Sequence, residues 1–186
     1  MLEGRIRISG KAETAPVHVH MDLEAKGNRF LGLGGNFRLQ NPGKDPMVID
    51  YCLGHMRMGF SRVEMPWSQW QPQENMDPSS GPLSGHVLES MEMAKRLKGM
   101  GHPLIVSCWF PPEWALQKGS VKGSQGVAAL KLDNEKKERI YQSLADYLVY
   151  LKEHMDTEAD YFSFNESDIG IDVLHTAQEH ADFIRE

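Results

Sequence analysis

The stretch Pro103-Leu104-Ile105-Val106-Ser107-Cys108-Trp109, continued by Phe110-Pro111-Pro112-Glu113-Trp114, decides the fold of this chain. Residues 103–109 lack the regular polar alternation of a strand with one wet face, which is typical of a strand covered on both faces. The prolines that follow end such a strand and begin a loop. We therefore predict a buried strand of a parallel sheet that leads into a loop rich in aromatic residues.

Similar units lie on both sides of this stretch. Strands are predicted at 29–37, 61–67, 103–109 and 161–166. Helices are predicted from Asp45-Pro46, from about Leu83 to Gly99 or Gly101, from about Asn134 to Met155, and from the capping box at Thr176–Glu179. The resulting β-α-β-α-β-α-β-α order favours a parallel sheet with helical crossovers.

The predicted helices carry apolar residues at helical spacing, which marks the face that each should bury. These residues are Val48, Tyr51, Cys52 and Met56 in the first helix, Val87, Met91, Ala94 and Leu97 in the second, and Ile140, Leu144, Tyr147, Leu148 and Leu151 in the third. The third helix has the clearest pattern.

Two architectures fit this order, an open doubly wound sheet and a barrel. The loops after the three later strands, at 67–82, 109–133 and 167–175, are long, and the first two are rich in tryptophan and proline. Long functional loops at the carboxyl ends of strands are typical of (β/α)8 barrels. We therefore predict an α/β fold in which residues 29–186 form the N-terminal half of a TIM barrel. Residues 1–28 are expected to form short β-strands, as the remnant of a flanking β-domain.

The composition of the chain excludes several classes of protein. With 186 residues, 40% hydrophobic and 25% charged, the chain has the composition of a globular domain. A net charge of −6 without a basic cluster argues against nucleic-acid binding, and no apolar run is long enough to span a membrane. The two cysteines, Cys52 and Cys108, are expected to be buried free thiols. No cofactor or metal is expected, and no secretory signal is visible at the N-terminus.

Asn165-Glu166 stands where the fourth strand is predicted to leave the sheet. A glutamate among aromatic rings loses hydration, which raises the pKa of its carboxyl group and fits it to donate a proton to a leaving oxygen. All four tryptophans, Trp67, Trp70, Trp109 and Trp114, follow strand ends, where indole rings can stack on sugar faces. They could instead pack as core beneath the loops.

At this point the sequence resembles a family. Residues 109–114, W-F-P-P-E-W, resemble the W-S-P-P-x-W segment of glycoside hydrolase family 30, although Phe110 stands where that family has serine. Residues 30–35 are similar to its G-F-G-G first strand, and residues 164–166 to the N-E of the wider clan A. The resemblance spans residues 29–186 and implies a retaining glycosidase on a (β/α)8 barrel.

The resemblance also implies roles for particular residues. Glu166 would be the acid/base, and Asn165 would bind the hydroxyl next to the anomeric carbon. Arg62 resembles the arginine that supports the nucleophile, and it could equally be a structural, ion-paired residue. Asn36 and the tryptophans Trp67, Trp109 and Trp114 would line the sugar subsite.

A retaining hydrolase needs a second carboxylate, which this clan places after the seventh strand. We therefore expect the chain to be the first half of such an enzyme, inactive alone. Glu64, Glu74 and Glu113 are weaker candidates for a local second carboxylate. A half-barrel exposes two sheet edges, which the missing C-terminal half or a second copy would cover. Two other functions stay open: a non-catalytic carbohydrate-binding half-barrel, and another α/β enzyme on an open parallel sheet.

Overall fold

The computed structural model describes residues 30–38, 43–119, 130–164 and 176–185, with the isolated residues Gly10, Pro16, His18 and Gly27. The chain divides into two compact units, Met1–Phe30 and Leu31–Glu186, and every helix and strand named below belongs to the second. The short strands predicted over 1–28, and the boundary predicted after residue 28, lie outside the described residues.

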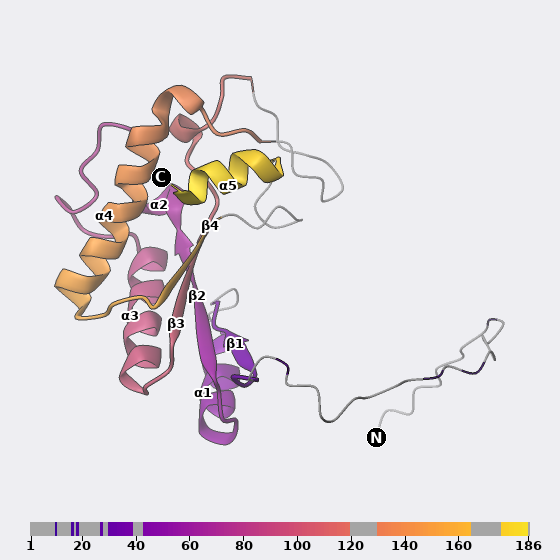
Figure 1. The fold of residues 1–186 in the computed structure, drawn as a ribbon. Coiled ribbons are helices and arrows are strands. Elements are labelled where there is room, and N and C mark those ends of the chain that lie inside the picture. The colour runs from indigo at the N-terminus through magenta and orange to yellow at the C-terminus, as the bar shows by residue number, and fades with distance from the viewer. Residues whose placement is uncertain are drawn as a thin grey trace. The chain divides into compact units, whose positions relative to one another are not determined.

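The second unit alternates strands and helices as the sequence predicts (Figure 1). The strands are β1 (Gly34–Asn36), β2 (Phe60–Pro66), β3 (Leu104–Trp109) and β4 (Tyr161–Phe164). The helices are α1 (Asp45–His55), α2 (Trp67–Trp70), α3 (Gly85–Gly99), α4 (Lys137–Met155) and α5 (Ala177–Arg185), with short 3-10 turns at η1 (Glu113–Ala115) and η2 (Asn134–Lys136).

The strand order decides between the two architectures that the sequence left open. The four strands are parallel and lie in the order β1-β2-β3-β4. A doubly wound sheet reverses its strand order beside the first strand, whereas a barrel adds each strand to the same side. The fold is therefore α/β with the topology of half a TIM barrel, as predicted.

Register gives the sheet two different faces, because successive side chains of a strand point to opposite sides. Val63 pairs in register with Val106 and Phe162, and Met65 with Cys108 and Phe164. This row is apolar and lies toward α3 and α4, which stand together on one side of β2 and β3 (Figure 1). The opposite face, called the inner face here, carries Arg62, Glu64, Ile105, Ser107, Trp109, Tyr161 and Ser163.

The predicted buried stripes of the second and third helices are confirmed. Val87, Met91, Ala94 and Leu97 of α3 are all at most 1% exposed, and Ser84 caps this helix by accepting a hydrogen bond from Val87 N. In α4, the buried residues include Ile140, Leu144, Tyr147 and Leu151, and Leu148 is half-buried. These stripes bury the apolar face of the sheet and form the core.

The first β-α unit differs from the prediction. Helix α1 buries Ile49, while Val48 and Tyr51 are 60% and 65% exposed, so the predicted face is wrong. Apolar residues surround this helix on nearly all sides, and only packing against the sheet selects one face. The first strand is also shorter than predicted, since β1 covers Gly34–Asn36 and Leu33 before it is 69% exposed.

Helix α5 begins with the predicted capping box. Glu179 N donates to Thr176 Oγ1 over 3.2 Å, and Thr176 N donates to Glu179 Oε2 over 2.8 Å. This exchange satisfies two backbone donors that a helix start leaves unpaired. The two cysteines are free thiols, as predicted, but only Cys108 is fully buried, and Cys52 of α1 is half-buried.

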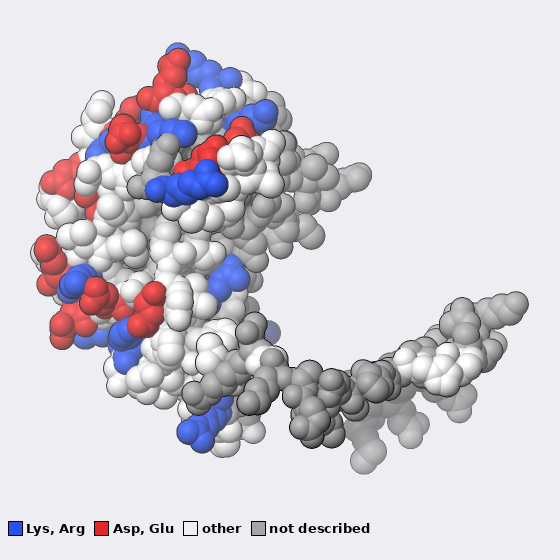
Figure 2. All heavy atoms as spheres, in the orientation of Figure 1, with Lys and Arg blue, Asp and Glu red and all other residues white. Residues whose placement is uncertain are grey.

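Charges of both signs are interspersed on the face that α3 and α4 present in Figure 2, with neither sign dominating. Several form ion pairs, such as Arg96 with Asp50 over 2.7 Å and Lys152 with Glu158 over 2.8 Å. Such exposed pairs contribute little to stability. Among the described residues, no helix has the length and apolar character needed to cross a membrane.

Asp160, just before β4, ties together three elements of the fold. Its Oδ2 accepts hydrogen bonds from Lys98 Nζ and from Leu104 N, each over 2.6 Å, and its own N–H donates to Leu104 O over 2.9 Å. The bond from Lys98, with that from Leu104 N, holds the pKa of the Asp160 carboxyl below its usual value of 3.8. The ionised carboxylate therefore favours the folded state at neutral pH.

We predict that Asp160→Asn lowers the free energy of unfolding at pH 7 by about 1 kcal/mol, since the exposed location screens the ion pair. Because the folded-state pKa is depressed, the advantage of the natural residue is present above pH 3.8 and fades as the pH falls through that lower pKa. Urea unfolding at pH 7 and near pH 3 measures this. If the difference in unfolding free energy between the variant and the parent grew at low pH, the ionised Asp160 carboxylate would not be the stabilising form.

Candidate functional site

The candidate site lies at the carboxyl ends of the strands, where barrel enzymes place their functional side chains. Three described strands contribute to it: Arg38 follows β1, Arg62 and Glu64 lie on β2, and Trp109 ends β3. Asn165 and Glu166, predicted as the hydroxyl-binding residue and the acid/base, follow β4 and lie outside the described residues. Their roles stay predictions.

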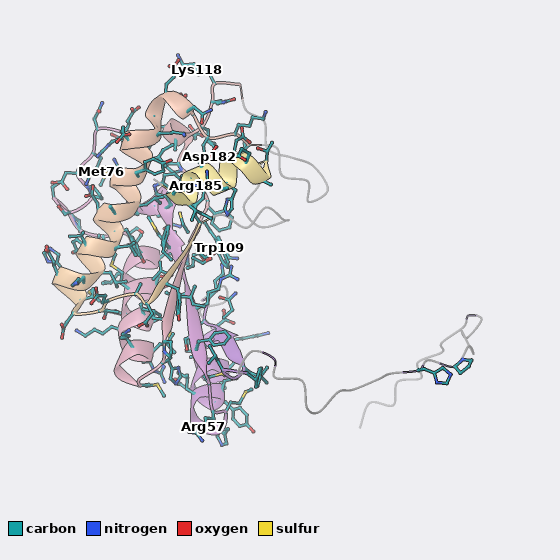
Figure 3. The ribbon with its side chains drawn as sticks, viewed as in Figure 1. Arg57, Met76, Trp109, Lys118, Asp182 and Arg185 are labelled. Atoms are coloured by element: carbon teal, nitrogen blue, oxygen red, sulfur yellow. The ribbon has the colours of Figure 1, made fainter. Side chains whose placement is uncertain are left out.

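Trp109 is the centre of the described part of the site (Figure 3). Its side chain is 5% exposed, and the guanidinium carbons of Arg38 and Arg62 lie 4.8 Å and 4.7 Å from the indole centroid. A guanidinium at this distance over a ring is held by the negative potential of its face. The indole Nε1 is buried and has no hydrogen-bond partner among the described residues. The described part of the site therefore contains a desolvated donor for which the described residues supply no acceptor.

Glu64 of β2 holds Arg38 in this cluster. The Glu64 side chain is 3% exposed, and its Oε2 lies 2.6 Å from Arg38 Nε. His86 Nε2, in the first turn of α3, is 3.5 Å from Glu64 Oε1, and Ser90 Oγ donates to the Glu64 carbonyl. A buried carboxylate is tolerated when it is paired in this way. Glu64 therefore acts in this structure as the partner that orients Arg38.

Phe110, next to Trp109, has a backbone that a bulky residue rarely adopts. Its φ is 55°, in the left-handed region, which has a free-energy cost for a residue with a Cβ. Its carbonyl accepts a hydrogen bond from Ser68 N over 2.9 Å, and its ring lies 5.2 Å from the Arg38 guanidinium carbon. These contacts stabilise the turn at Phe110, through which the chain passes from β3 into the loop that follows.

The structure separates the four tryptophans that the sequence placed on one rim. Trp67 and Trp70 are 1% and 2% exposed, and both indoles bond to Ser143 of α4, through its Oγ over 2.9 Å and its carbonyl over 3.1 Å. Both belong to the core between sheet and helix. Only Trp109 among these rings shares the inner face with Arg62. The sugar contact predicted for Trp67 stays a prediction.

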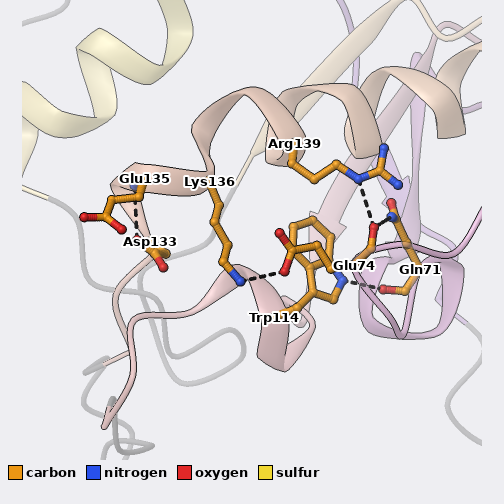
Figure 4. A network of polar contacts seen from close by, with 7 residues as sticks. All are labelled: Gln71, Glu74, Trp114, Asp133, Glu135, Lys136 and Arg139. Carbon is orange, nitrogen blue, oxygen red and sulfur yellow. Dashed lines mark hydrogen bonds and ion pairs between the residues drawn. The ribbon is translucent and has the colours of Figure 1, made fainter.

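Trp114 is half-buried and fixed by a network that joins two loops (Figure 4). Its Nε1 donates to Gln71 O over 2.8 Å, and the buried Gln71 amide donates in turn to Glu74 O over 2.9 Å. Arg139 and Lys136 at the start of α4 bind the Glu74 carbonyl and carboxylate over 3.0 Å and 2.7 Å. This network braces the loop after β2 against the helix that follows β3.

Two further predicted residues can be placed. Asn36 pairs in register with Arg62 across β1 and β2, and its side chain is exposed, so the two stand side by side on the inner face. Of the other carboxylates considered, Glu74 is engaged with Lys136, while Glu113 is exposed in η1.

Arg38, Glu64, His86 and Phe110 form part of the described site. Sequence analysis assigned no role to Arg38, His86 or Phe110, and it considered Glu64 only as a weaker candidate for a second carboxylate. The only signal for Glu64 was a charged residue within an otherwise buried strand. Cys108, in the row next to that of Glu64, faces the core, where burial and then the Glu64 charge raise the pKa of its thiol. A thiol in that state is a poor nucleophile. No group of three potential metal-ligating side chains occurs within the described ranges.

Comparison with known proteins supports the fold. No family model matches the sequence, and no curated protein matches it. A solved structure of a GH30 endoxylanase from Clostridium papyrosolvens C71 superposes with a TM-score of 0.58 at 18% sequence identity. The match covers 88% of this chain and 40% of that chain. The chain therefore has a fold like that of a glycoside hydrolase, and it spans well under half the length of the enzyme it is similar to.

Proposed function

We propose that the chain carries the N-terminal half of the catalytic barrel of a retaining glycoside hydrolase, of clan A and most similar to family 30. Its substrate would be a β-linked glycan, with xylan as the first choice because the structural neighbour is an endoxylanase. The observation that carries this proposal is the buried Trp109 indole at the strand ends, whose N–H has no acceptor among the described residues and stands beside two guanidinium groups.

An unpaired buried donor is unfavourable by about 1–3 kcal/mol, so a ligand that supplies an acceptor there would gain that free energy. A sugar hydroxyl oxygen is a fitting acceptor for Trp109 Nε1. The guanidinium of Arg62 and the exposed amide of Asn36 stand on the same face and supply further donors. The inner face thus offers several hydrogen-bond donors where a glycan would lie.

In the proposed reaction, Glu166 donates its proton to the glycosidic oxygen as the bond to the anomeric carbon breaks. The carboxylate expected after the seventh strand attacks that carbon and forms a glycosyl ester. Glu166, now ionised, takes a proton from water, whose oxygen displaces the ester and releases the sugar with its original anomeric configuration. Asn165 would bind the neighbouring hydroxyl, and Arg62 would hold the nucleophile.

The two outer strands of the described sheet support the proposal that further β-α units complete the barrel. Neither β1 nor β4 has a second neighbour within the described ranges, and Tyr161 and Phe162 of β4 are 61% and 37% exposed. Exposed apolar strand edges are covered in native proteins. We propose that four further β-α units cover them in the working enzyme, with a second copy of this chain as the alternative cover.

Trp109→Phe tests the proposed role of the indole. Phenylalanine keeps one aromatic ring but lacks both the buried N–H and the five-membered ring of the indole. Relief of the unpaired donor partly offsets the lost packing, so we expect the free energy of unfolding to fall by less than about 1 kcal/mol. The affinity for xylohexaose should fall about fivefold to tenfold, the value of one hydrogen bond. Calorimetric titration and urea unfolding measure the two effects.

The matched control is Trp70→Phe, which removes a satisfied indole bond in the core and should lower stability without changing sugar affinity. If Trp109→Phe destabilised the protein as much as Trp70→Phe does and left binding unchanged, the indole would be structural. Binding without hydrolysis in a protein that carries all eight β-α units would favour a carbohydrate-binding function instead.

A further inference from the structure

We propose a second glycan-binding site, for a neutral pyranose unit, in a cavity bounded by α5, the first turn of α4 and the loop that follows β3. The cavity has a volume of about 430 Å³, within the range of small-molecule sites. It shares no residue with the cluster around Trp109. The choice of a sugar as ligand rests on the proposed function, whereas the cavity and its chemistry do not.

The cavity has an apolar floor that suits the C–H face of a sugar ring. Leu132 and Ile140 are 8% and 1% exposed, and Phe183 of α5 stands beside them. Phe183 is held in place by stacking on Phe164 at the end of β4, at 4.0 Å between centroids, and edge-on by Tyr141 at 5.0 Å. The floor is therefore built into the packing of α5 against α4 and the sheet.

The walls carry polar groups that form no hydrogen bond with the rest of the described chain. The side-chain amides of Gln117 and Asn134 are accessible to solvent and have no hydrogen-bond partner in the described ranges. Asp182 Oδ1 accepts from Gln178 and Arg185, and no bond to Oδ2 is formed by the described residues. Amides and a carboxylate can donate to and accept from neighbouring hydroxyls, which is what a sugar requires.

The charge on the walls favours a neutral ligand. Two lysines, Lys131 and Lys137, and two carboxylates, Glu179 and Asp182, line the cavity, so the lining has two formal positive and two formal negative charges. An anionic ligand such as a phosphate would require an excess of positive charge. A polyhydroxylated, uncharged molecule meets no net repulsion here.

The place of the cavity in the fold also suits a glycan. Gln117 and Asn134 come from the loop at the carboxyl end of β3, and α5 follows the carboxyl end of β4. Backbone bonds from Gln117 N to Lys131 O and from Asp133 N to Ala115 O, both 2.9 Å, hold this loop as a short antiparallel pair. The cavity thus opens among the same loops that carry the proposed active site.

The double variant Gln117→Ala/Asn134→Ala tests the proposal. Both side chains reach solvent, so folding should not change, while the affinity for xylohexaose or cellohexaose should fall about tenfold through the loss of two hydrogen bonds. Gln142→Ala, an exposed amide on α4 outside the cavity, is the control and should leave affinity unchanged. Amide chemical shifts of Leu132 and Ile140 should move when xylohexaose is added to the unaltered chain.

Unchanged affinity in the double variant, or tighter binding of a charged galacturonate oligomer than of the neutral probes, would overturn this proposal. If Trp109→Phe still weakened binding in that case, the proposed function would stand without the second site. If no glycan were hydrolysed by the complete protein, yet the double variant lost affinity for the neutral probes, the second site would stand and the proposed function would fail.

Discussion

Replacing Glu166 by glutamine is expected to lower kcat/KM for xylan by about 10²–10⁴-fold, in a protein that also carries the carboxylate after the seventh strand. Glutamine keeps the shape of the side chain and removes the proton that assists departure of the leaving oxygen, a loss of that size. Activated aryl groups leave without this help, so kcat/KM should fall much less with a dinitrophenyl leaving group than with xylan. The kcat for the dinitrophenyl substrate should stay low, because glutamine cannot take the proton of the attacking water. Steady-state kinetics on both substrates measures the difference.

The control for this prediction is Glu92→Gln, an exposed carboxylate on the outer surface of α3, which should leave turnover unchanged. The 186 residues alone are expected to show no turnover, since the second carboxylate is not among them in the proposal. Full activity in Glu166→Gln, or an equal loss of kcat/KM with both leaving groups, would remove Glu166 from the acid/base role.

Replacing Trp67 by alanine is expected to lower the free energy of unfolding by about 3–5 kcal/mol, the usual range for a buried tryptophan. Trp67 is 1% exposed and packs edge-on against Trp114 and Phe164, at 6.0 Å and 6.2 Å between centroids. Its Nε1 also donates to Ser143 Oγ, which joins the end of β2 to α4. The substitution removes a large apolar volume and leaves a cavity where the sheet meets the helix.

Urea unfolding of Trp67→Ala beside Tyr161→Ala checks the prediction, because Tyr161 is 61% exposed and its loss should change stability by less than about 0.5 kcal/mol. The loss of unfolding free energy in Ser143→Ala should lie between these two values, at about 1–3 kcal/mol, since the substitution leaves a buried indole donor unpaired. If Trp67→Ala fails to accumulate as a folded protein, Trp67→Phe gives the same ranking at a smaller loss. Equal stability of Trp67→Ala and its parent would place Trp67 outside the core.

Sequence analysis predicted the described fold correctly wherever the residue pattern of an element was compatible with only one structure. The apolar stripe of α4 and the capping box of α5 could each be read from spacing, because both depend on residues within a turn or two of one another. The parallel sheet followed from the alternation of strands and helices. Helix α1 failed because apolar residues lie on most of its sides, so its spacing could not select the buried face.

The tryptophans show the same limit at the site. Sequence analysis placed all four after strand ends, which is correct for the backbone, and could not tell which indoles turn toward the helices. Trp67 and Trp70 face α4 because Ser143, a residue far along the chain, accepts their N–H groups. Trp109 faces the other way because strand register puts it on the row of Pro66 rather than that of Met65.

By itself, the sequence determined the order of strands and helices, the caps and the buried stripes, since these depend on local backbone chemistry and on the period of apolar residues. Tertiary structure alone decided the face that α1 buries and the gathering of Arg38, Glu64, His86 and Trp109 from the segment after β1, two strands and a helix. The reason is physical: a pairing between distant residues depends on register and on the competition of many side chains for one interior, which no local spacing records.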